Sequence, residues 1–135
     1  MRHKAVLGEA EARSILDAAA AAARSDGLAM SIAVTDDSGH PLALLRLDGA
    51  GLMTPKVAEQ KARTAALIRA PSRRLADRIA AEPALLRLTD YLPMAGGLPI
   101  VVDGQCVGAI GISGGTPDQD ERIGEAGLAA LAETT

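Results

Sequence analysis

The sequence of 135 residues contains no tryptophan, no phenylalanine and a single tyrosine. Without aromatic rings to fill gaps, the core must be built from Leu, Ile, Val and Ala, which favours closely packed backbones. The chain carries 14 Lys and Arg against 17 Asp and Glu, a net charge of −3. Because it has neither stacking rings nor a cationic surplus for phosphates, nucleic-acid binding is disfavoured.

Cysteine, histidine and long apolar runs are also scarce. The single cysteine, Cys106, has no partner for an internal disulfide, and no His or Cys spacing is typical of a metal site, so we expect no metal ligands. No apolar run is long enough to span a bilayer, and the basic N-terminus lacks the apolar segment of a signal peptide. The expected location is therefore the cytoplasm.

The most informative stretch runs from Met94 to Leu131. Two apolar runs, 98–102 and 105–112, flank Asp103-Gly104, a pair that favours a tight hairpin because both positions need positive φ. Thr116 then begins a helix, with a proline at its first position and a glutamine three residues on that completes a capping box. The pattern predicts a hairpin that leads directly into a C-terminal helix.

The remaining elements follow from periodicity and turn signals. Helices are predicted over 9–25, 54–68 and 72–81, and strands over 30–36 and 41–47. The connection 82–93 is rich in leucine, so we expect it to pack down as a flap. The order α, β-hairpin, α, α, β-hairpin, α predicts one α+β domain over residues 1–135, with a central antiparallel sheet of four or five strands covered by helices.

One lysine, Lys61, lies on the stripe of helix 54–68 that is predicted to face the core. Either its stem packs while the ammonium reaches water, or the cation points into a pocket for a carboxylate or an imine. Arg46 is a second cation for a carboxylate, and backbone amides at the glycine turns are natural anion donors. The candidate ligand-binding residues are Arg46, Lys61, Tyr91, Met94, Gly96, Gly97, Ser113 and Gly114.

Proton transfer would need a desolvated carboxylate and a donor. The candidate catalytic residues are Lys61, Asp36, Asp48, Asp120 and Ser113. The structural alternative is that Asp36 and Asp48 are turn residues with Arg46 as their salt-bridge partner, and that Asp120 is a charge at a helix start. For Lys61, the structural alternative is a pair with an aspartate such as Asp36 or Asp48. The glycines would then serve only close helix–sheet packing.

Heme ligation usually uses His, Cys, Met or Tyr. His3 lies near the N-terminus and His40 at a predicted hairpin tip, so both are expected to be solvated. Tyr91 and Met94 lie closer to predicted pocket loops, although a methionine there usually serves packing. The histidines also form no Ser-His-Asp signature.

Several stretches, in the right order over nearly the whole chain, together resemble the GlcG/HbpS family, a heme-binding-protein-like group also found as the C-terminal domain of PduO-type proteins. These stretches are Ser31–Asp36 with Gly39-His40, Arg46 and Asp48; Lys61–Ala65; Gly96–Ile100; Val107–Gly114; and Asp120 with Glu125-Ala126-Gly127. The resemblance implies an αβα sandwich of the profilin-like kind, usually assembled into homo-oligomers. Some members bind heme or corrinoid-like tetrapyrroles, and some are encoded in operons for small-acid catabolism. The family shares no heme-ligating residue, so the resemblance assigns no iron ligand in this sequence.

The leading hypothesis is therefore a cytoplasmic, homo-oligomeric small-ligand-binding protein of the GlcG/HbpS type, whose ligand is heme or another tetrapyrrole. The alternative is a cofactor-independent enzyme, of the isomerase, tautomerase or hydratase type, that acts on a small unsaturated carboxylate in a catabolic pathway. A third hypothesis is a purely structural subunit, which requires this fold but no ligand or reaction.

Overall fold

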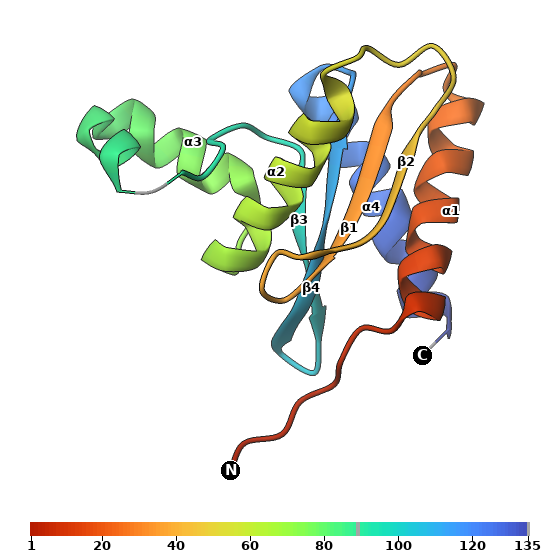
Figure 1. Ribbon diagram of the computed structural model, residues 1–135, viewed down its shortest axis with the longest axis horizontal. Coiled ribbons are helices and arrows are strands. Elements are labelled where there is room, and N and C mark those ends of the chain that lie inside the picture. Colours follow the sequence, from red (N-terminus) through yellow and green to blue (C-terminus); the bar gives the residue numbers. More distant parts are fainter. Residues whose placement is uncertain (89, 135) are drawn as a thin grey trace.

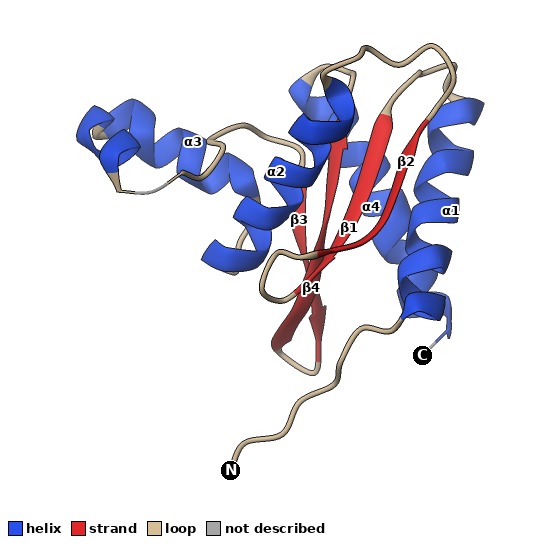
Figure 2. Cartoon of the chain, in the orientation of Figure 1, coloured by secondary structure: helices blue, strands red, loops and turns tan. Residues whose placement is uncertain are grey.

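The structure is a computed structural model that describes residues 1–88 and 90–134. Figure 1 shows the course of the chain, and Figure 2 shows a sheet with helices on both of its faces. In chain order the elements are α1 (Glu9–Ser25), β1 (Ser31–Asp36), β2 (Pro41–Arg46), α2 (Thr54–Ile68), α3 (Ser72–Ala81), the 3-10 helix η1 (Pro83–Arg87), β3 (Gly97–Val102), β4 (Gln105–Ser113) and α4 (Pro117–Thr134). The predicted order and the α+β class are confirmed.

The four strands form one antiparallel sheet in the order β2-β1-β4-β3. Each hairpin contributes one edge strand, and the inner strand β1 pairs over its whole length with residues 108–113 of the other inner strand, β4. Since side chains alternate along each strand, the sheet has two faces of different composition. This difference decides which helix packs where.

One face of the sheet carries the large aliphatic side chains and is covered by α1 and α4, which pack against each other (Figure 1). Its fully or nearly fully buried strand residues are Ile32, Val34, Leu98, Ile100, Ile110 and Ile112. The alanine face of α1 lies over these residues, and Leu7, which precedes the helix, joins the same core. Burial of this aliphatic layer is the main contribution of the sheet to stability.

The other face of the sheet is built from small residues and is covered by α2. Ala33 and Ala109 on the strands meet Ala58, Ala62 and other alanines of the helix. A Cβ at Gly111 would lie 2.0 Å from the Ala58 carbonyl oxygen, so the helix backbone lies directly on the strand. Only glycine permits such an approach.

Local signals at the second hairpin and the last helix behave as predicted. Asp103 and Gly104 adopt φ values of +50° and +75°, as a tight hairpin turn requires. The Gln119 amide N–H donates to Thr116 Oγ1 over 3.2 Å, and the Thr116 N–H donates to Gln119 Oε1 over 2.9 Å. The capping box is thus complete.

Two expectations about packing were wrong, the first being that Val57 and Ile68, spaced with Lys61, Thr64 and Ala65 on or beside one stripe of the helix, face the core. The buried stripe of α2 is formed by Ala58, Ala62 and Ala65 with Lys61 and Thr64, while the larger Val57 and Ile68 are only half-buried. The small sheet face explains this, because no space remains for large side chains between the two backbones.

The connection after α3 does not pack down as a flap. Leu86 and Leu88 are 58% and 68% exposed, and with α3 they form an arm that projects from the sheet (Figure 1). The chain is fastened where it returns from the arm, since the Leu92 N–H donates to Thr64 Oγ1 and Ser72 Oγ donates to the Met94 carbonyl. No helix within the described residues is long and apolar enough to cross a membrane.

Candidate functional site

Lys61 and Asp120 form a buried ion pair at the end of the sheet. Lys61 is 2% exposed, and its Nζ donates to Asp120 Oδ2 over 2.8 Å and to the Ile112 carbonyl over 3.0 Å. Asp120 is also 2% exposed, and its Oδ1 accepts the Gly115 N–H over 2.9 Å. The pair joins α2 to the turn between β4 and α4, so its charges are satisfied within the protein.

The glycine turns that we expected to offer amides converge on this same place. A Cβ at Gly96 would lie 2.9 Å from Lys61 Nζ, and one at Gly97 would lie 2.1 Å from the Lys61 carbonyl oxygen. The Gly97 N–H donates to Ser72 Oγ over 2.8 Å, while Gly114 has a φ of +132° and packs against Met30. Ser113 beside it is 7% exposed. Close packing therefore accounts for these glycines, and the Lys61 side chain fills the space between the turns.

Burial raises the pKa of the Asp120 carboxyl, because an apolar surrounding disfavours the charged form. The Lys61 ammonium and the Gly115 N–H act in the opposite direction by stabilising the carboxylate. Each oxygen of this buried carboxyl group therefore accepts a hydrogen bond from within the protein.

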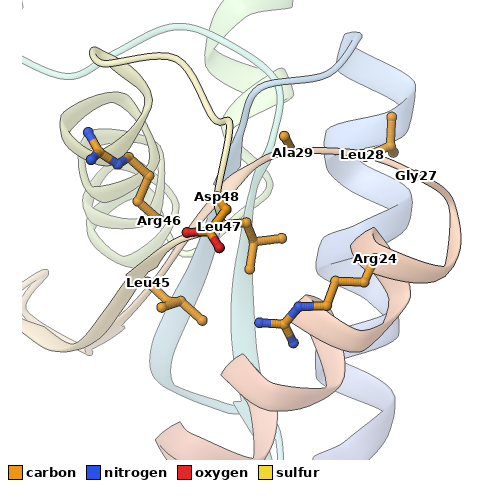
Figure 3. Close-up of a pocket in the computed structure, with 8 residues that line it drawn as sticks. All are labelled: Arg24, Gly27, Leu28, Ala29, Leu45, Arg46, Leu47 and Asp48. Carbon is orange, nitrogen blue, oxygen red and sulfur yellow. The ribbon is translucent and has the colours of Figure 1, made fainter.

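Arg46 and Asp48 lie elsewhere, at the exit of β2. A cavity of about 350 Å³, here called the β2 cavity, is lined by Arg24, Gly27, Leu28, Ala29, Leu45, Arg46, Leu47 and Asp48. Figure 3 shows that the Arg46 side chain lies on the opposite side of the strand from Arg24. Lys61 does not line this cavity and is already paired with Asp120, so the structure does not bring the two cations into one cavity.

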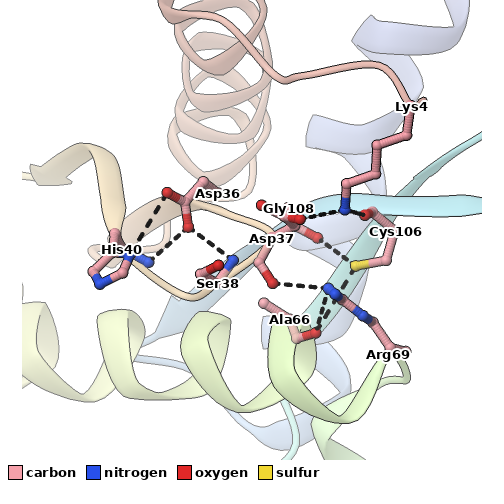
Figure 4. A network of polar contacts seen from close by, with 9 residues as sticks. All are labelled: Lys4, Asp36, Asp37, Ser38, His40, Ala66, Arg69, Cys106 and Gly108. Carbon is pink, nitrogen blue, oxygen red and sulfur yellow. Dashed lines mark hydrogen bonds and ion pairs between the residues drawn. The ribbon is translucent and has the colours of Figure 1, made fainter. Parts of the chain in front are cut away.

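Asp36 is a turn residue, as the structural alternative expected. Its Oδ1 accepts the N–H groups of Ser38 and His40, both over 2.9 Å, and its Oδ2 lies 3.7 Å from His40 Nδ1 (Figure 4). These contacts organise the β1–β2 turn.

Tyr91 and Met94 lie in the segment that returns from the arm to β3. The Arg63 guanidinium carbon lies 5.7 Å from the centre of the Tyr91 ring, which is half-buried. Met94 is 48% exposed. The structure therefore places the two residues near α2 and α3, away from the β2 cavity.

A larger cavity, of about 700 Å³, lies beside the β3–β4 hairpin, and we call it the hairpin cavity. It is lined by Met1, Arg2, His3, Lys4, Arg69, Val101, Gly104, Gln105 and Cys106. Lys4 Nζ donates to Asp37 Oδ2, and over 3.2 Å to the Cys106 carbonyl, so the N-terminal segment is fastened across the hairpin (Figure 4). Sequence reasoning missed this site because its residues come from four segments; the run of basic residues at 2–4 was the one available signal.

Comparison with known proteins identifies the family. Residues 7–129 match the family model described as "Haem degrading protein HbpS-like". The chain belongs to the HbpS-like family. Protein GlcG of Escherichia coli K12 is 37% identical to it over 114 residues, which are 84% of this chain and 85% of GlcG.

Solved structures of HbpS-like proteins agree with the fold. The crystal structure of a Streptomyces reticuli HbpS double mutant has a TM-score of 0.90 and 38% identity, covering 97% of this chain and 90% of that one. A structure described as a PduOC:heme complex has a TM-score of 0.86 and 25% identity, covering 93% and 95%. The αβα arrangement of this HbpS-like chain is thus that of solved members.

Proposed function

We propose that this protein binds heme or a closely related tetrapyrrole. The observation that carries the proposal is that residues 7–129 match the HbpS-like family and that a solved structure 25% identical to this chain is described as a heme complex. The chain itself supplies what such a ligand needs. Imidazole, thioether and phenol groups are present for the iron, and cations lie beside a cavity large enough for a substantial ligand.

The geometry gives less support to an enzyme that acts on a small carboxylate. That reaction would need Lys61, Arg46 and a carboxylate base around one substrate. In the structure Lys61 is buried against Asp120, Arg46 is exposed on an edge strand, and Asp36 organises a turn. The candidate base Asp120 does lie beside Lys61, but the two charges are buried against each other, while Arg46 and Asp36 belong to other parts of the surface.

Titration with hemin tests the proposal. The Soret band should shift and saturate at one heme per chain or at a simple fraction of that ratio. A linear rise without saturation would indicate adsorption to apolar surface and would contradict the proposal.

We also propose that the protein self-associates. Leu86 and Leu88 on the arm are exposed, and so are Leu42 and Leu44 on the edge strand β2, at 39% and 47%. Large apolar side chains that gather on a projecting element are typical of surfaces covered by a partner. Homo-oligomers, which the family resemblance implies, would cover them.

A further inference from the structure

The two edge strands of the sheet, β3 and β2, differ in how their outward peptide groups are used. On β3, the Gly96 carbonyl accepts the Ile112 N–H over 2.9 Å, so by the alternation of an antiparallel pair the peptide groups of Gly97 and Pro99 point away from β4. The Gly97 N–H is already bound to Ser72 Oγ over 2.8 Å, and Pro99 has no N–H to offer. A further strand therefore finds no continuous row of donors on β3.

The other edge strand, β2, keeps its outward peptide groups free. The Leu47 N–H donates to the Met30 carbonyl over 2.9 Å, and β2 pairs with β1 in a regular register over residues 43–46. By the same alternation, the N–H and C=O groups of Leu44 and Arg46 point away from β1. Among the described residues these four groups have no hydrogen-bond partner.

The features that protect an edge strand are confined to the start of β2. Pro41 is the first residue of the strand, and the register shift lies next to it, between Val34 and Thr35 of the partner strand. The part that follows carries Leu42 and Leu44, whose side chains are 39% and 47% exposed. An apolar edge with free peptide groups is the arrangement to which another strand is added.

The side chain of Leu44 borders a groove between β2 and α2. Leu44 lies opposite Ala33, on the face of the sheet that α2 covers. The groove has a volume of about 430 Å³ and is lined by Leu44, by the outer side of α2 and by Asp90. A strand added to β2 would place alternate side chains on this face, next to the groove.

The charged residues around this groove are only partly paired. Arg63 binds Asp90 over 3.2 Å. Glu59 is half-buried and Lys56 is exposed, and among the described residues neither has an ion-pair partner. Arg46, at the end of β2, is likewise exposed and forms no ion pair within this part of the chain. The surface therefore carries a carboxylate in the groove and a free cation on the strand beside it.

We propose that two copies of this chain pair antiparallel through β2, which joins their four-stranded sheets into one. The outward peptide groups of Leu44 bond those of the partner's Arg46, and a two-fold axis repeats the contact, so the free groups of both strands are satisfied. Opposite residues share a face of the sheet, so the partner's Arg46 lies beside Leu44 and its guanidinium reaches Glu59. This contact rests on the self-association proposed above and assigns it to one surface.

Charge reversal tests the contact in solution. Arg46→Glu and Glu59→Arg should each raise the dissociation constant of the dimer by about tenfold or more, because a like charge replaces the ion pair. Sedimentation of the full chain measures the change. The two substitutions in one chain restore opposite charges, so the double variant should associate almost as the wild type does. Arg13, exposed on α1, provides the control Arg13→Glu, which should leave association unchanged.

A cysteine at the two-fold axis tests the register. In this register Leu45 faces the partner's Leu45 in a non-hydrogen-bonded pair, with Cα atoms about 4.5 Å apart, within the range of a disulfide. In a Cys106→Ser background, Leu45→Cys should form a covalent dimer when oxidised with diamide. The matched control is Ala43→Cys on the same face of β2. Its counterpart lies four residues further along the pair, about 13 Å away, so it should not cross-link.

The outcomes separate this contact from self-association in general. Wild-type association that Arg46→Glu and Glu59→Arg leave unchanged, or that their combination fails to recover, would overturn pairing through β2 and leave self-association through another surface standing. Cross-linking of Ala43→Cys, or none of Leu45→Cys, would equally overturn it. A wild-type protein that remains monomeric would instead contradict the proposed self-association.

Discussion

At the scale of single residues, the Lys61–Asp120 pair is the electrostatic interaction whose loss should change stability most. Both charges are removed from water, and each is satisfied by its partner and by one backbone group. A buried pair of this kind adds little net stability over an apolar pair, but removal of one member leaves an uncompensated charge. The pair therefore fixes how α2 meets the start of α4.

Replacement of Lys61 by methionine should lower the free energy of unfolding by about 3–5 kcal/mol at neutral pH, because the Asp120 carboxylate is left buried alone. Urea denaturation measures the loss. The double variant Lys61→Met/Asp120→Asn keeps an acceptor for the Gly115 N–H and removes the charge, so it should recover a large part of the stability.

The same variant should show a distinctive pH dependence. Loss of Lys61 removes the group that opposes the effect of burial, so the pKa of Asp120 rises further above its ordinary value of 3.8. A raised pKa in the folded state favours folding most below that ordinary value, and this contribution is lost as the pH rises through the folded-state pKa. The stability gap to the wild type should therefore narrow as the pH is lowered toward the ordinary value. A Lys61→Met protein as stable as the wild type, with hemin binding abolished, would instead make Lys61 a ligand-binding residue.

At the scale of elements, the two faces of the sheet determine the helix packing. Alternate positions of β4 place Ile110 and Ile112 on one side and Ala109 and Gly111 on the other. Side chains separate α1 and α4 from the first face, whereas the backbone of α2 touches the second. An added methyl group on the face built from alanine and glycine therefore displaces the backbone of α2.

Substitution of Gly111 by alanine tests this contact. The new Cβ would lie 2.0 Å from the Ala58 carbonyl oxygen and 2.6 Å from the Ala62 nitrogen, so α2 must move. We expect a loss at or above the upper end of the ~1–3 kcal/mol range for overpacked cores, measured by thermal or urea unfolding. In the control Gly8→Ala, the new Cβ meets only the end of the Glu11 side chain at 3.1 Å, and the change should be below about 1 kcal/mol. Equal stability of the two variants would show that α2 can shift without cost.

At the scale of the whole molecule, the arm formed by α3 and η1 distinguishes this chain from a closed sandwich. Within the described residues, the buried side chains of α3 are Ser72 and Leu75, and η1 has none that are fully buried. The arm is supported mainly at its base, where Thr64 and Ser72 bind the returning chain. Its leucines have no partner in the aliphatic core.

Sedimentation at micromolar concentration should show a species larger than the 13.7 kDa chain, because association covers the exposed leucines of the arm. The variant Leu86→Ser/Leu88→Ser should shift the distribution toward the monomer. Val6, at 84% exposure on the N-terminal segment, provides the control substitution Val6→Ser, which should leave the distribution unchanged. A wild-type protein that sediments only as the 13.7 kDa monomer would contradict self-association.

The sequence by itself determined the elements and their order. The hairpin at Asp103-Gly104 and the capping box at Thr116 were correctly predicted because each depends on contacts within a few residues. The sequence also grouped Lys61 with the glycine turns as candidate ligand-binding residues, and the structure brings these residues together. The aspartates named as partners in the structural alternative, Asp36 or Asp48, were wrong, because Lys61 binds Asp120.

The tertiary structure alone decided which distant groups meet. Asp120 lies 59 residues from Lys61, and Lys4 binds groups 33 and 102 residues away, so neither contact could be read before the strand order was known. Which side chains of a helix are buried likewise depends on the sheet face that the helix covers. The buried stripe of α2 and the exposure of the arm were therefore predicted wrongly from local sequence. Local sequence determines backbone conformation, whereas the positions of charges and apolar surface depend on the packing of the whole chain.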